Sequence, residues 1–158
     1  MMAIFRLHLV IITLSMQVAR GCLPGWTAFG GSCYSLSFDK LDWIAASAAC
    51  CSVDAYLLEI EGENENKFIS AIITNQYKHG SYWLGGSDVF VEGDWRWMNT
   101  NQRFNYTNWQ QEQPSNLPGY DCVGAHSDDY SFRWRDYDCT EKHKYICEAR
   151  SGTWIIFG

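Results

Sequence analysis

The sequence predicts an α+β fold in which two helices pack on small antiparallel sheets. Three observations support this class: two segments with helical spacing in the first half, short Trp-rich strands in the second half, and seven cysteines, which indicate a disulfide framework. With 158 residues, no internal repeat and no linker, the chain is long enough for one domain with its own core.

The first 21 residues have the features of a secretory signal peptide. Arg6 supplies the positive charge, and residues 7–14 form the apolar stretch. The small residues Ala19 and Gly21 stand three and one positions before the expected cut. A membrane anchor is the alternative, but the apolar stretch is far shorter than the roughly 20 residues that span a bilayer. We therefore expect a secreted, extracellular protein.

Cleavage after residue 21 would leave a domain over residues 22–150 and a short tail over residues 151–158. It would remove Arg6 and Arg20 and leave ten basic and 18 acidic side chains, a net charge of −8 compared with −6 for the whole chain. Nucleic acid and anionic membrane surfaces are poor partners for such a charge, because both attract basic faces. No other segment is long and apolar enough to span a membrane.

The mature chain begins with a hairpin and a helix. Residues 22–35 alternate apolar residues with turn-forming glycines, which indicates a short hairpin. Asp39 could cap a helix, with Asp42 three positions later as in a capping box. Ala46 and Cys50 then belong to the stripe that this helix would bury.

The remaining elements alternate between strands, one helix and a long loop. Residues 56–60 are a strand-like apolar run, and an amphipathic helix follows Gly62. Residues 82–85 begin a β-rich half, and residues 144–148 form the closing strand. Between them, residues 100–131 lack a regular pattern, and a loop of that length inside a compact domain is usually functional.

Four motifs in this order resemble the C-type lectin family. They are Trp83-Leu84-Gly85-Gly86, Gln113-Pro114-Ser115, Trp134-Arg135-Asp136 and Tyr145-Ile146-Cys147-Glu148. The resemblance as a whole covers residues 22–150, and the chain is most similar to the long-form, molluscan perlucin-like members. The resemblance implies the C-type lectin-like fold, with a long binding loop and three disulfides.

The resemblance also supplies a cysteine pairing that the cysteine count leaves open. It implies the bridges Cys22–Cys33, Cys50–Cys147 and Cys122–Cys139. Cys51 is left without a partner, so it could join two copies of the chain or remain a buried thiol, and exchange with Cys50 is a further possibility.

In sugar-binding members of the family, a principal calcium ion in the long loop contacts the sugar directly. The resemblance places Gln113, Ser115, Tyr120, Arg135 and Asp136 at this carbohydrate site. Gln113 matches the galactose-type pattern, and Tyr120 is the expected stacking platform. Gln113, Ser115 and Asp136 could still act as metal ligands. However, the five side chains carry no net charge, so we expect weakened calcium binding.

The family's auxiliary calcium site is better preserved. Asp88 and Glu92 match its first two carboxylates, Asn116 takes the place of a loop carboxylate, and Asp121 matches another. The alternative is that these acids only solvate the loops. Asn105 begins the single Asn-x-Ser/Thr sequon and is a candidate N-glycosylation site.

These observations favour a carbohydrate-binding lectin over an enzyme. The mature chain has three histidines, His79, His126 and His143, but neither a His-Glu-x-x-His pair nor a Gly-x-Ser-x-Gly elbow. We expect glycan partners of the galactose or GalNAc type, a role in innate immunity or agglutination, and possible homo-oligomers through Cys51. The alternative function is a perlucin-like mineral-matrix or protein-binding module without sugar binding.

Overall fold

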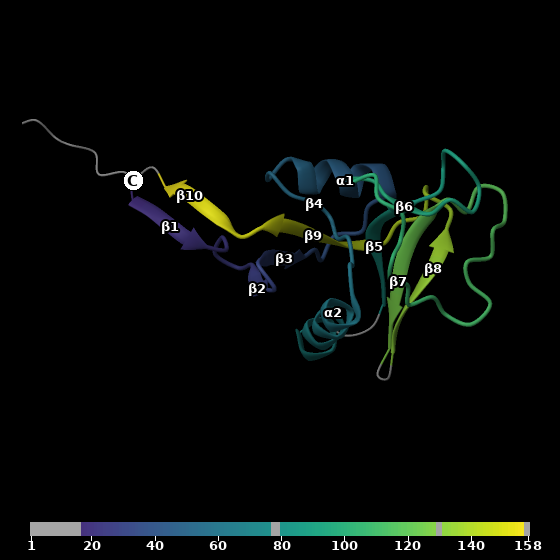
Figure 1. Ribbon diagram of the computed structural model, residues 1–158, viewed down its shortest axis with the longest axis horizontal. Helices are drawn as coiled ribbons and strands as arrows, with labels where there is room; N and C mark the ends of the chain where they lie inside the picture. The colour runs from purple at the N-terminus through teal and green to yellow at the C-terminus, as the bar shows by residue number, and fades with distance from the viewer. Residues whose placement is uncertain (1–16, 77–79, 129–130, 157–158) are drawn as a thin grey trace, which may run out of the picture.

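The computed structural model describes residues 17–76, 80–128 and 131–156 (Figure 1). The helices are α1 (Trp43–Cys51) and α2 (Glu63–Gln76). The strands are β1 (Gln17–Gly21), β2 (Thr27–Phe29), β3 (Ser32–Leu36), β4 (Tyr56–Leu57), β5 (Gly80–Ser87), β6 (Arg96–Trp97), β7 (Cys122–Ser127), β8 (Phe132–Tyr137), β9 (Lys144–Arg150) and β10 (Gly152–Ile156).

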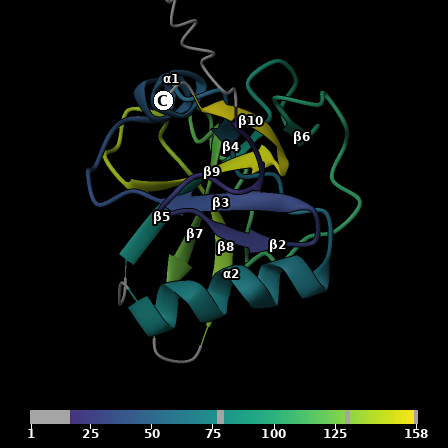
Figure 2. The same ribbon diagram turned by 90° about the vertical axis from the view of Figure 1, so that its left-hand side faces the viewer.

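The expected α+β class is confirmed, and the strands join into one path. Eight strands form a sheet with the order β2-β3-β9-β5-β7-β8, in which β4 also pairs with β9 and β6 with β5. The pairing of β5 with β9 is parallel, so the sheet is mixed. The two helices lie on opposite sides of this sheet (Figures 1 and 2).

The core has two parts because neighbouring residues of β5 face opposite sides of the sheet. Tyr82 lies in the cluster that α2 covers, together with Ile69 and Trp134. Trp83 lies in the second cluster, where it packs near Cys50 of α1. Helix α2 and the long loop, which packs on Trp134, therefore cover the first cluster, whereas α1 covers the second.

Helix α1 begins later than its capping pattern suggests. The N-cap is Asp42, whose Oδ1 accepts a hydrogen bond from the backbone N–H of Ala45 at 2.8 Å. The prediction of a cap at Asp39 was wrong because Leu41 exchanges backbone hydrogen bonds with His143, which holds the chain extended up to the helix. The helix start is thus set by a residue 102 positions away, which local sequence propensity does not take into account.

Two further boundaries differ from the expectation. The strand predicted for residues 56–60 is only β4, although Leu58 still bonds to Ile146 through its backbone. The irregular loop expected over residues 100–131 ends at Asp121, since β7 follows. Strand β7 is central in the sheet and its residues Val123-Gly124-Ala125 are buried on both faces, so it lacks the alternation that marks a half-exposed strand.

All three expected bridges, Cys22–Cys33, Cys50–Cys147 and Cys122–Cys139, are present. The remaining cysteine, Cys51, is a free and exposed thiol at the end of α1. The buried-thiol alternative is therefore not what the structure shows. The possibility of an intermolecular bridge stays a prediction.

The two ends of the described chain pair with each other. Strand β1, which lies inside the predicted signal peptide, is antiparallel to β10 in the tail, and the pair stands apart from the main sheet (Figure 1). Residues 1–16, with the charged and apolar parts of that peptide, lie outside the described residues. Within the part that is described, no helix is long and apolar enough to cross a bilayer.

Candidate functional site

The long loop and β8 bring three of the predicted site residues together. Ser115 Oγ donates to Asp136 Oδ2 at 2.7 Å, and the backbone N–H of Asp136 lies 3.3 Å from Gln113 Oε1. The peptide bond between Gln113 and Pro114 is cis. The Asn116 backbone N–H also donates to Asp136 Oδ2, at 3.0 Å. One carboxylate on β8 therefore organises the loop segment that the sequence singled out.

Asp136 combines deep burial with an unused acceptor. Its side chain is only 5% exposed, and Oδ1 has no hydrogen-bond partner among the described residues. An unsatisfied buried acceptor costs about 1–3 kcal/mol, which is why such atoms are rare away from functional sites. The free oxygen lies in the group that already holds Gln113 and Ser115, so this point can accept a proton donor or a cation.

The other two predicted residues take different positions. Arg135 is next to Asp136 on β8, but its Nε donates to Gln110 Oε1, on the opposite face of the strand from the buried carboxylate. Tyr120 is 39% exposed, and its backbone N–H closes a turn onto the Leu117 carbonyl. Arg135 therefore does not join the Asp136 group, whereas Tyr120 has a ring surface open to a ligand.

The auxiliary acids surround a second buried aspartate. Asp88 is 3% exposed, and its Oδ2 accepts from the Gly93 N–H at 2.8 Å. Its Oδ1 has no partner among the described residues. Burial raises the pKa of Asp88, and the nearby Glu92 and Asp121 carboxylates raise it further. Backbone contacts fix the two loops together, since Asp88 N–H donates to the Asp121 carbonyl at 3.2 Å.

The two carboxylate positions differ in how well they suit calcium, which takes six to eight oxygen ligands. The Asp136 group has a single carboxylate, and one of its oxygens already accepts two hydrogen bonds, so these residues do not fit a calcium ion. Around Asp88 the negative charge is sufficient. However, no three His, Cys, Asp or Glu side chains within the described residues converge in metal-binding geometry. The Asp88 group thus has enough negative charge to attract a cation, but its side chains do not converge into a complete set of ligands.

Sequence reasoning missed the amides that support the loop. Asn108 Nδ2 donates to the Phe132 carbonyl at 2.6 Å, and its backbone carbonyl accepts from Trp134 N–H at 2.9 Å. The Gln110 N–H then donates to the Trp134 carbonyl, so the segment 108–110 pairs with the outer edge of β8. Trp134 is fully buried and packs edge-on against Trp109, which is partly buried.

Comparisons with known proteins agree with this geometry. The family model of the lectin C-type domain matches residues 39–149. The chain is 32% identical to the perlucin-like protein of Mytilus galloprovincialis, with 92% of this chain and 94% of that protein covered. It is 29% identical to the galactose-specific lectin nattectin of Thalassophryne nattereri, with 85% and 84% covered.

Solved structures show the same architecture. The carbohydrate-recognition domain of the mouse scavenger receptor C-type lectin has a TM-score of 0.74 and 30% identity, and the match covers 83% of this chain and 98% of that one. A calcium-independent type II antifreeze protein has a TM-score of 0.74 and 26% identity, with 85% and 98% covered. Proteins of this architecture therefore include one described as calcium-independent.

Proposed function

The chain belongs to the C-type lectin family, and we propose that it binds carbohydrate at the group formed by Gln113, Ser115 and Asp136. The observation that carries the proposal is the buried Asp136 carboxylate, which holds both neighbours and keeps Oδ1 unpartnered. A sugar hydroxyl can donate to such an acceptor after a small opening of the loop, while the Gln113 amide and the Ser115 hydroxyl bond to its neighbours.

A galactose-type ligand is favoured by two features. Gln113 stands where galactose-binding members of the family have glutamine, and one similar protein is named a galactose-specific lectin. The apolar face of such a ring can stack on the half-exposed ring of Tyr120. Single shallow sites of this kind bind weakly, so strong binding would come from several linked copies, for which Cys51 offers an exposed thiol.

Calcium would bind only at the auxiliary group. Asp88, Glu92, Asn116 and Asp121 would hold the ion, with the unpartnered Asp88 Oδ1 as its first ligand. A bound cation supplies positive charge that neutralises the acids and fixes the 88–93 turn against the loop before Cys122. Contact with the sugar is left to Gln113, Ser115 and Asp136.

We further propose that the protein is secreted after loss of residues 1–21 and acts outside the cell in recognition or agglutination. The disulfides suit an oxidising compartment. Asn105 is exposed, as an N-glycosylation acceptor must be.

The test is a glycan-array screen of the mature domain, once with calcium and once with EDTA. Galactose- or GalNAc-type binding is expected in both arms, because the Asp136 group needs no metal. The variant Asp136→Asn keeps the shape and removes the charge, and it should lose at least about tenfold in affinity. Binding that disappears in EDTA would contradict the metal-free contact. Absence of binding in both arms by a folded sample would overturn the lectin proposal.

A protein partner is the second candidate function, and one surface favours it. Val89, Phe90 and Val91 form the tip of the turn beside Asp88, and Phe90 is 79% exposed. A contiguous patch of exposed apolar side chains often marks an interaction surface, whereas single exposed apolar residues are common on any protein. The mineral-matrix role is supported by the similarity to the perlucin-like protein and by the acidic charge.

A further inference from the structure

Strand β8 presents two arginines on its outer face. Phe132, Trp134 and Asp136 are buried, whereas Arg133 is exposed and Arg135 is half-buried. Because side chains alternate along a strand, the two guanidinium groups point to the same side, with Cα positions about 6.5–7 Å apart. This side is opposite to the one that carries Asp136.

Two amides hold these guanidinium groups in place. The segment 108–110 pairs with the edge of β8, so its own alternation puts Asn108 and Gln110 beside the arginines. Arg133 Nη1 donates to Asn108 Oδ1, and Arg135 Nε donates to Gln110 Oε1. Asn108 is itself anchored to the Phe132 carbonyl. The arginines are thus oriented by neutral partners.

Both positive charges remain uncompensated. Among the described residues, neither guanidinium lies within ion-pair distance of a carboxylate, although the whole chain carries a net charge of −6. Each guanidinium has five N–H donors, of which the amides take one from each, and Arg135 also bonds to the neutral Tyr137 hydroxyl. The planar edges that remain match the geometry of sulfate and carboxylate oxygens.

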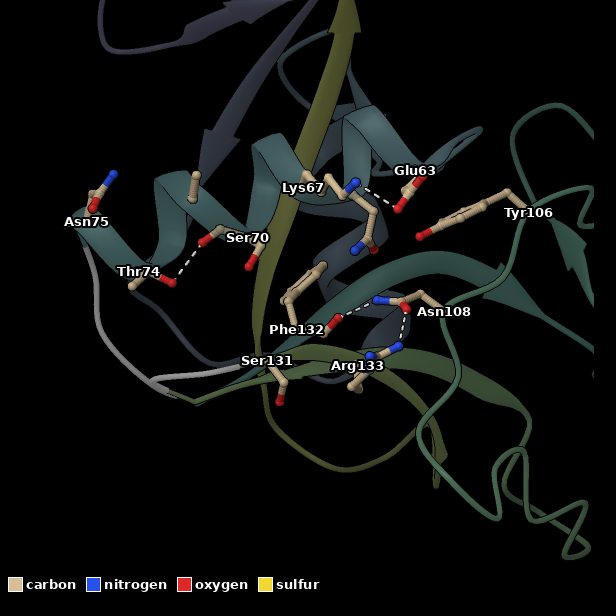
Figure 3. Close-up of a pocket in the computed structure, with 12 residues that line it drawn as sticks. Glu63, Lys67, Ser70, Thr74, Asn75, Tyr106, Asn108, Ser131, Phe132 and Arg133 are labelled. Carbon is tan, nitrogen blue, oxygen red and sulfur yellow. Dashed lines mark hydrogen bonds and ion pairs between the residues drawn. The ribbon is translucent and has the colours of Figure 1, made fainter.

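The arginines lie in a polar groove that continues to α2. A cavity of about 410 Å³ contains both arginines, and it shares Ser131 and Arg133 with a cavity of about 540 Å³. Figure 3 shows the second cavity, with Glu63 and Lys67 of α2 on one side and Tyr106 and Arg133 on the other.

The two acids of this groove already have partners. Glu63 pairs with Lys67 at 2.7 Å, and Asp128 Oδ1 accepts from the backbone N–H of Ser131 at 2.7 Å. The rest of the lining is mainly hydroxyl and amide groups, such as Ser70 and Thr74. The five charged side chains of the lining therefore sum to a formal charge of +1, with the positive excess at the arginine pair. A pair of arginines followed by hydroxyl and amide groups suits a hydroxyl-rich chain that carries an acidic substituent.

We propose that this groove is a second binding site, which takes an oxyanion-bearing polysaccharide, with a sulfate or carboxylate group held by Arg133 and Arg135. The site is separate from the Gln113–Asp136 group and needs no metal. Nucleic acid fits less well, because its closely spaced phosphates need several basic side chains, whereas the whole chain carries a net charge of −6.

The test compares four immobilised polymers in EDTA: dextran sulfate, polygalacturonate, neutral dextran and single-stranded DNA. The intact chain should bind the sulfated or the carboxylated polymer, bind neutral dextran at least about tenfold more weakly, and lose affinity with rising salt. The charged polymer that binds better identifies the anion. Equal binding to neutral dextran, a preference for DNA, or no binding to either charged polysaccharide would overturn the proposal.

The double variant Arg133→Gln, Arg135→Gln should lose at least about tenfold in affinity, because charge-assisted hydrogen bonds are lost. The matched control is Lys142→Gln, Arg150→Gln, which removes the same charge from exposed positions outside the groove. It should remain within about threefold of the intact chain. An equal loss in both double variants would overturn the proposal, since binding would then follow net charge alone.

A lysine pair guards against misfolding of the glutamine variant. Arg133→Lys, Arg135→Lys keeps both charges and loses the planar fork, so it should retain more affinity than the glutamine pair and less than the intact chain. Thermal unfolding, together with binding of a neutral galactose-type sugar at the Gln113–Asp136 group, reports whether the rest of the domain is intact. A folded lysine pair that binds no better than the glutamine pair would contradict the electrostatic basis of the site.

Discussion

Two pairs of carboxylates that are buried or partly buried differ in whether every side-chain oxygen has a hydrogen-bond partner. The helix-side pair, Glu65 on α2 and Glu148 on β9, has its hydrogen bonds satisfied: Tyr34 Oη donates to Glu65 at 2.6 Å, and the Glu59 N–H lies 3.3 Å from Glu148 Oε2. The loop-side pair, Asp88 and Asp136, is as deeply buried as Glu148, whereas Glu65 is only partly buried. Each loop-side residue keeps one carboxylate oxygen that has no hydrogen-bond partner among the described residues.

The difference shows that burial of an acid does not by itself mark a ligand site. On the helix side, desolvation raises the pKa of Glu148 to about 7, and the carboxyl can be protonated to match its surroundings. On the loop side, Asp136 accepts two hydrogen bonds on one oxygen, and the other oxygen accepts none from the residues that the structure describes. The unpartnered oxygen distinguishes a binding position from a structural one.

The largest expected effect on stability comes from removing the disulfide beside each pair of carboxylates. Cys50–Cys147 adjoins Glu148 and closes 97 positions, whereas Cys122–Cys139 adjoins the loop and closes 17. By chain entropy their loss should lower the free energy of unfolding by about 4–5 and about 3 kcal/mol, respectively. Urea unfolding of the two double Cys→Ala variants measures both values.

Both variants should carry Cys51→Ser, so that the exposed thiol cannot replace a lost partner. The Cys122–Cys139 variant should lose sugar affinity beyond what its stability explains, because that bridge clamps the base of the loop. Two outcomes would contradict this difference between the two regions. One is a larger loss of stability without Cys122–Cys139 than without Cys50–Cys147, and the other is unchanged sugar binding without Cys122–Cys139.

Much of this arrangement follows from the sequence, because it depends on short motifs. The three bridges appear as expected, and Gln113, Ser115 and Asp136, which the motifs single out, lie side by side. Each is tied to a spacing that the family motif fixes, so a local pattern carries the information.

Other features depend on contacts that no local pattern contains. The start of α1 is set by the pairing of Leu41 with His143, far apart in the chain. The outward direction of Arg135 follows from the strand pairing of segment 108–110, which leaves Gln110 beside it. The unpartnered oxygens likewise depend on where every neighbouring donor lies, which only the folded arrangement determines.

An intermediate effect is expected from Glu148→Gln on the helix side. In the unfolded chain the pKa of glutamate is about 4.5, and burial raises it to about 7 in the folded domain. The native state therefore binds more protons, and the stability that this confers, fully present below about pH 4.5, is lost as the pH rises through 7. The variant should be more stable than the intact chain by about 1–3 kcal/mol at pH 8.

Urea unfolding at pH 5 and pH 8 checks this prediction, because the gain should nearly vanish at pH 5, where Glu148 is protonated. Glu112→Gln removes the same charge from an exposed loop position and serves as the control. A variant that is destabilised at pH 8, or that gains equally at both pH values, would show that Glu148 is ionised in the native state and held by its hydrogen bonds.

The smallest expected effect is that of Asp88→Asn on the loop side. Without calcium, the amide removes repulsion with the nearby Glu92 and Asp121 carboxylates, so stability should rise by less than about 1 kcal/mol. With millimolar calcium, the melting temperature of the intact domain should increase, because a ligand that binds only the native state stabilises it by mass action. The variant should lose that increase.

Asp54→Asn, at an exposed position outside the loops, is the matched control and should keep the calcium response. Asp136→Asn should keep it as well, because the Asp136 group lacks the charge for calcium. If Asp136→Asn abolished the response while Asp88→Asn kept it, the two loop-side aspartates would have exchanged roles. The ion would then lie at the sugar contact, and the unpartnered Oδ1 of Asp136 would be a metal ligand rather than an acceptor for a hydroxyl.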